Sequence, residues 1–208
     1  MRRSFVLRFA AVAALAFAAP ALTPRAALAD ASEPAAQQIE TFDAALIRTM
    51  KAGKEAGPQG RAKIIGPAVD AAFNIPAMTA FAVGPAWTTA STEDKAALIS
   101  AFRKYTIANY AKNFDGYDGQ KITVDPTVLT RLPDKLVKTT MTGGDAPVVL
   151  GYRMRQAGST WKVIDVLFNG AISQLTTQRS DFTATLQNGG VKALVAKLDA
   201  QTEKLLKP

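Results

Sequence analysis

The residue with the clearest chemical potential is Asp165, which lies in the apolar stretch WKVIDVLF at residues 161–168. An ionised carboxylate among apolar groups is unfavourable unless it is paired or hydrogen-bonded. One interpretation is a general acid or base at the floor of a cavity. The other is a structural carboxylate, which pairs with a basic side chain or accepts hydrogen bonds from backbone N–H groups near a helix start. Because buried charges are usually paired, this second interpretation is favoured.

A second charged residue stands in an apolar stripe just downstream. Apolar residues recur at helical spacing from Ile172 to Leu186, and Arg179 occupies the middle of that stripe. A buried arginine needs a buried partner, so we expect a structural ion pair between Asp165 and Arg179. Alternatively, the head of Arg179 reaches solvent along its apolar stem.

Other catalytic chemistry has little basis in the sequence. The chain contains neither cysteine nor histidine, which excludes a conventional catalytic triad, a thiolate nucleophile, a disulfide and an imidazole metal site. No serine lies in a G-x-S-x-G frame, and the glycine pairs at 143–144 and 189–190 are typical of turns and helix ends. We therefore expect no cofactor, no metal and no enzymatic activity. The alternatives are a carboxylate-only metal site, or a small-molecule enzyme in which Asp165 acts with a tyrosine as acid or base.

The first 29 residues have the pattern of a secretory signal peptide. Basic residues precede an apolar run at residues 9–19, and a small-x-small cleavage site ends at Ala29. The run is too short to span a bilayer comfortably, and a retained N-terminal anchor is the competing interpretation. Cleavage before Asp30 leaves one domain at residues 30–208, not membrane-spanning, and reduces the formal net charge from +8 to +4. Without a concentrated basic face, this charge does not favour nucleic-acid binding.

The elements that position these residues change type along the chain. Helical spacing and capping residues predict helices at residues 31–50, 64–72, 74–84 and 91–114. Period-two alternation between 120 and 168 predicts three to four antiparallel strands. Helices return at 171, break at 188–190 and resume at 191–206. This order indicates an α+β fold with helices packed on one face of a curved antiparallel sheet.

The strand at residues 161–168 is apolar on both of its faces. Strict alternation places Asp165 with Val163 and Leu167 on one face, and Val166 on the other. A strand of this kind is normally covered above and below. A curved sheet with amphipathic helices can enclose a cavity as easily as a solid core, so both arrangements are open at this point.

Four segments, in this order, resemble the MlaC family of periplasmic lipid-binding proteins, also called toluene-tolerance proteins. The segments lie between residues 73 and 198: FNIPAMTAFAVGPAW, AFRKYTIANYAKNFDGYDG, YRMRQAGSTWKVIDVLFNGAISQLTTQRSDF and NGGVKALVAKL. The FDGYDG and GAISQLTTQRSDF stretches are more similar to HpnM, the branch associated with hopanoid lipid genes. The usual MlaC pattern has a segment like GVSL…NYRSQF at the second of these stretches.

The resemblance implies a fold like nuclear transport factor two, in which a curved sheet and helices close a deep apolar pocket. It also implies a periplasmic carrier that moves a phospholipid or hopanoid between the outer and inner membranes. Its partners would be an inner-membrane ABC transporter complex and an outer-membrane lipoprotein complex. We expect the pocket to be lined by apolar and aromatic side chains: Phe81, Trp87, Phe102, Tyr105, Leu150, Tyr152, Val163, Val166, Leu167, Ile172 and Leu175.

Four basic residues are candidates for the surface that meets acidic partners or anionic headgroups. They are Arg103, Lys104, Arg153 and Arg155. With a mature charge of only +4, simple solvation of these side chains explains the sequence equally well.

Overall fold

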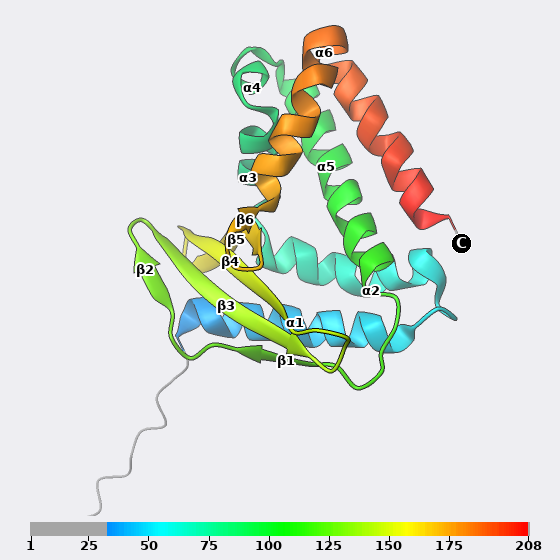
Figure 1. Cartoon of the computed structure of the whole chain (residues 1–208). Helices are drawn as coiled ribbons and strands as arrows, with labels where there is room; N and C mark the ends of the chain where they lie inside the picture. Colours follow the sequence, from blue (N-terminus) through cyan, green and yellow to red (C-terminus); the bar gives the residue numbers. More distant parts are fainter. Residues whose placement is uncertain (1–32, 208) are drawn as a thin grey trace, which may run out of the picture. The chain divides into compact units, whose positions relative to one another are not determined.

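The structure is a computed structural model, which describes residues 33–207; the predicted signal peptide at 1–29 lies outside the described residues. Five helices precede six strands, and a long helix follows them (Figure 1). This order confirms the predicted α+β fold. The elements are α1 (Pro34–Ala52), α2 (Gly57–Ala72), α3 (Ile75–Val83), α4 (Pro85–Thr89), α5 (Thr92–Asn113), β1 (Lys121–Val124), β2 (Leu129–Arg131), β3 (Asp134–Thr142), β4 (Val148–Ala157), β5 (Thr160–Phe168), β6 (Ile172–Ser173) and α6 (Gln174–Leu206).

Side-chain caps start α3 and α5 at the predicted positions. The Asn74 side chain accepts a hydrogen bond from the backbone of Ala77 at the start of α3, and the Ser91 hydroxyl accepts one from Asp94 at the start of α5. Gly190, with φ of 64°, interrupts α6. The chain turns back there, so that α6 has an ascending and a descending half (Figure 1). None of the described helices is long and apolar enough to cross a membrane.

The strands form one antiparallel sheet in the order β1-β3-β4-β5-β6, and β2 also pairs with β3. The predicted strand segments correspond to β1, β3, β4 and β5. The sequence did not predict β2 or β6, whose three and two residues are too few to show an alternation, or α4, whose five residues make little more than one helical turn.

A β-bulge at Ile164 changes which face of the sheet the following side chains of β5 point to. Val163 pairs with Met154 and Asp165 pairs with Arg153, so that Ile164 is an extra residue. As a consequence, Val163 and Val166 point to the same face, and Asp165 points to the opposite one. The strict alternation assumed from the sequence, with Asp165 and Val163 on one face, is therefore wrong.

The helices cover one face of the sheet, which we call the inner face. Phe42 of α1 packs edge-on against Tyr152 of β4 and against Phe73 at the end of α2. These residues belong to a continuous core of fully buried side chains from every layer, including Ile39, Leu46, Ile65, Val69, Leu98, Phe102, Val137, Met154, Val163, Leu194 and Leu198.

Asp43 of α1 is an acidic residue inside this core. It is 5% exposed, and within residues 33–207 neither of its carboxylate oxygens has a hydrogen-bond partner of normal geometry, nor has the neighbouring Tyr152 hydroxyl. Burial raises the pKa of Asp43 to about 7; the Tyr152 hydroxyl opposes that rise and Glu40 adds to it. The folded state therefore disfavours ionisation of this group, whereas an unfolded aspartate ionises near pH 4.

This difference predicts a stability that falls as pH rises from about 4 to 7 and then levels off. We expect Asp43→Asn to increase the free energy of unfolding at pH 8, by at most about 4 kcal/mol, and to change it little at pH 4. Urea denaturation at both pH values measures the effect. The exposed Asp145→Asn serves as control, and equal stabilisation at the two pH values would contradict the assignment.

Candidate functional site

A cavity of about 460 Å³ lies between the inner face of the sheet and the helices α5 and α6. Its volume is within the usual range for small-molecule sites. The side chains that line it come from α3, α5, β3, β4, β5 and the first turns of α6, with Phe73 from the chain between α2 and α3. The cavity therefore depends on how α5 and the start of α6 are placed over the sheet.

The sheet side of the cavity is apolar. Val148 and Leu150 of β4 and Val166 of β5 face it, with Met141 and Phe168 beside them. These residues occupy one end of the inner face. At the other end the strand residues Val137, Tyr152, Met154 and Val163 are fully buried in the core. All of these residues lie on the inner face, and their position along the strand decides whether they line the cavity or belong to the core.

The helix side of the cavity is mixed. Leu175, Tyr105, Tyr110 and Phe114 provide apolar surface, and Tyr110 also packs on Phe42 in the core. Burial raises the pKa of Tyr110 beyond its usual range, so this phenol is neutral. The remaining lining residues of α5 and α6 are polar: Thr106, Asn109, Asn113, Gln174, Thr177, Gln178 and Asp181.

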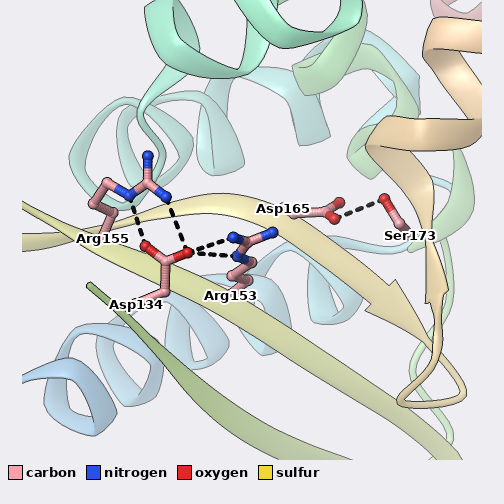
Figure 2. A network of polar contacts seen from close by, with 5 residues as sticks. All are labelled: Asp134, Arg153, Arg155, Asp165 and Ser173. Carbon is pink, nitrogen blue, oxygen red and sulfur yellow. Dashed lines mark hydrogen bonds and ion pairs between the residues drawn. The ribbon is translucent and has the colours of Figure 1, made fainter. Parts of the chain in front are cut away.

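The start of α6 is fixed by Asp165. One carboxylate oxygen accepts a hydrogen bond from the backbone N–H of Leu175 (3.2 Å), and the other accepts one from the Ser173 hydroxyl (2.6 Å; Figure 2). The Ser173 hydroxyl oxygen in turn accepts from the backbone N–H of Thr176. A negative charge at this end of a helix is also favoured by the helix dipole. Asp165 thus positions the helical turn that closes one side of the cavity.

The profile of the MlaC protein family matches residues 40–200, which is most of the chain. The chain belongs to the MlaC family. The fold is similar to that of a phospholipid-binding protein from Ralstonia solanacearum solved in complex with a phospholipid, with a TM-score of 0.73 and 22% sequence identity. That match covers 84% of this chain and 100% of the other, and at this identity it shows the fold. No protein with a curated description matches the chain.

Four of the predicted pocket residues line the cavity of this MlaC-family chain: Tyr105, Leu150, Val166 and Leu175. The other seven do not line it among the described residues. Phe102, Tyr152 and Val163 are core residues covered by helices. Leu167 faces away with Asp165, and the rest are partly or largely exposed: Phe81, Trp87 and Ile172.

Several lining residues were not identified from the sequence. Met141, Val148 and Phe114 are ordinary apolar positions of a strand or helix, and only the three-dimensional packing separates them from core positions. The polar lining residues follow the helical period of α5 and α6, as any solvent-exposed stripe does. No pattern in the sequence marked them as cavity residues.

The predicted ion pair between Asp165 and Arg179 is wrong. Within residues 33–207, no ion pair joins them. The carboxylate of Asp165 instead accepts hydrogen bonds at the start of α6. The guanidinium of Arg179 lies over the ring of Phe81, 5.2 Å from its centroid, and against Gly84. A cation over an aromatic face is favourable without a carboxylate partner.

On the outer face of the sheet, two arginines share one buried acid. Arg153 and Arg155 each approach a carboxylate oxygen of Asp134 at 2.6 Å (Figure 2). Asp134 is 2% exposed, whereas both arginines are about half exposed. The hydrogen bond from Arg155 holds the pKa of Asp134 below its usual range, and Arg153 acts in the same direction. The cluster therefore presents an excess positive charge to solvent. In the exposed pairs Arg103–Asp70 and Lys104–Asp199, one cation faces one carboxylate, so that each pair has a net charge of zero.

The helix-start role of Asp165 gives a testable difference between two substitutions. We expect Asp165→Ala to lower the free energy of unfolding by about 1–2 kcal/mol, the typical effect of losing a helix cap. Asp165→Asn keeps an acceptor for the Leu175 N–H and should lower it by less. Denaturant titration measures both. Combining Asp165→Ala with Arg179→Ala should be additive, and a coupling above about 0.5 kcal/mol would restore the ion-pair interpretation.

Proposed function

We propose that the protein is a lipid carrier, which holds the apolar part of a phospholipid or hopanoid in the cavity between the sheet and α5 and α6. The observation that carries this proposal is the apolar surface of Val148, Leu150 and Val166 facing open space rather than packed core. Membership of the MlaC family and the phospholipid bound to the structurally similar Ralstonia protein support it.

The cavity size limits how much of a lipid is enclosed. A volume of about 460 Å³ lies within the range of roughly 300–1,000 Å³ of sites for small ligands, which gives room for an acyl chain. Each buried CH₂ stabilises the complex by about 0.8 kcal/mol, so that one chain offsets a large part of the free energy of leaving a bilayer.

Binding rather than catalysis is the function that the cavity chemistry favours. The proposed acid–base residue of the alternative, Asp165, is engaged with Ser173 and Leu175 and is not among the residues that line the cavity in the described part of the chain. Its carboxylate holds the start of α6 in place, so that replacing Asp165 should lower the stability of the fold rather than abolish a chemical activity.

The signal-peptide pattern of residues 1–29 leads us to propose that the carrier acts in the periplasm, and the intact mass of the exported protein tests cleavage before Asp30. There it would exchange lipid with an inner-membrane ABC transporter complex and an outer-membrane lipoprotein complex. The HpnM-like segments favour a hopanoid-associated role.

The cavity assignment predicts loss of lipid when a charge is placed on the sheet side. Val166→Glu should reduce the lipid retained by the purified protein at least roughly tenfold, because an unpaired carboxylate would face acyl chains. Val149→Glu is the matched control, since Val149 precedes Leu150 on β4 and points to the outer face. Mass spectrometry of organic extracts measures the lipid, and circular dichroism verifies the fold. Equal lipid contents in the two variants would contradict the cavity as the lipid site.

The outer-face arginines predict an electrostatic docking surface. Arg153→Gln should slow association with the inner-membrane transporter complex several-fold at low salt and less at high salt, because surface charges act mainly on encounter. Arg155 still neutralises Asp134 in this variant. Arg103→Gln, which removes a cation from a neutral pair, is the control. Surface plasmon resonance measures the rates, and a larger effect of the control would refute this surface.

A further inference from the structure

The polar part of the cavity lining has an unusual composition for a site that would receive a phosphate. It consists of amide and hydroxyl side chains and a single charged group, the carboxylate of Asp181. Among the described residues that line the cavity there is no lysine and no arginine. Phosphate groups in proteins are typically held by arginine, lysine or arrays of N–H donors.

The amides on the two helices have hydrogen-bonding capacity to spare. Asn109 of α5 donates one N–H to the backbone oxygen of Tyr105 (2.9 Å), which leaves its carbonyl oxygen and second N–H available. Gln178 of α6 makes no side-chain hydrogen bond within residues 33–207 and is half-buried beside the cavity. An amide both donates and accepts, which suits a hydroxyl group; a phosphate diester only accepts.

Two basic side chains of α6 make contacts outside the cavity lining. Lys197 donates to the backbone oxygen of Asp181 and to the Thr185 hydroxyl, at 3.1 and 3.0 Å. Arg179 lies over Phe81. The carboxylate of Asp181 is exposed at the cavity and would repel an anionic headgroup, whereas it can accept a hydrogen bond from a hydroxyl.

We infer that the cavity selects lipids whose polar end is uncharged and hydroxylated, with Asn109, Gln178 and Asp181 as the groups that recognise it. This inference rests on the proposed lipid-carrier function and specifies the ligand class of the same site. The apolar surface of β4 and β5 binds the tail irrespective of the head. The polar residues of α5 and α6 distinguish one head from another.

An internal competition tests this selectivity. The mature protein is incubated with vesicles that contain equal amounts of three lipids with identical dioleoyl tails and different heads: glucosyl, phosphocholine and phosphoglycerol. The protein is then separated from the vesicles, and its bound lipids are quantified by mass spectrometry. Because all three lipids share one membrane, attraction of the protein to the vesicle surface does not bias the comparison.

We expect the glucosyl lipid to be enriched roughly tenfold over the phosphoglycerol lipid, as two additional hydrogen bonds would give. Asp181→Lys should reduce that enrichment at least threefold. Glu203→Lys makes the same change of charge on α6 at an exposed position away from the cavity and should leave it unchanged. In the same way, Gln178→Leu should reduce the enrichment and Gln187→Leu, exposed on the same helix, should not.

The outcomes separate this inference from the carrier function. Equal uptake of the three lipids, or preference for phosphoglycerol, would overturn the headgroup selectivity and leave the carrier function standing. An equal response to Asp181→Lys and Glu203→Lys would overturn the role of Asp181. Uptake of none of the three lipids would overturn the carrier function, and the selectivity with it.

Discussion

The attachment of α6 to the sheet through Asp165 is the interaction on which the cavity depends. The carboxylate holds Ser173 and Leu175, and the next turns of the same helix supply Thr177, Gln178 and Asp181 to the lining. A helix that began elsewhere would either fill the space over β5 with its apolar face or leave it open to water. The bulge at Ile164 is part of this arrangement, because it turns Asp165 away from the face on which Val163 and Val166 lie.

One face of the sheet therefore serves two purposes. Under α1, the strand side chains interdigitate with Phe42 and its neighbours in a dense core, which stabilises the domain. Under α5 and the start of α6, the same strands face a cavity. Tyr110 contributes to both regions, since it lines the cavity and packs on Phe42. The core supplies the stability that lets the neighbouring region remain unfilled.

The sequence predicted the elements better than the site. Capping residues such as Asn74 and Ser91, the turn at Gly190 and the long alternating strands have local signals, and the structure has those elements. The bulge has none, because Val163, Ile164 and Val166 are all β-branched aliphatic residues and either facing looks equally apolar. The cavity lining was partly missed for a similar reason: periodicity identifies the face of a strand, but not which end of it the helices leave uncovered. Asp165 and Arg179 were rightly singled out as unusual, and the error lay in pairing them with each other.

The packing of α1 has a consequence for the order in which the protein folds. Its Phe42 contacts Tyr152, a residue more than a hundred positions later in the chain, and its N-cap Glu33 forms an ion pair with Lys135 of β3. Closing so long a loop is entropically unfavourable until the strands are paired. The next element in the chain, α2, packs on α1 and covers part of its apolar stripe early, whereas the part that faces the sheet stays uncovered until β3 and β4 have been made. Apolar surface that is exposed in a partly folded chain favours aggregation.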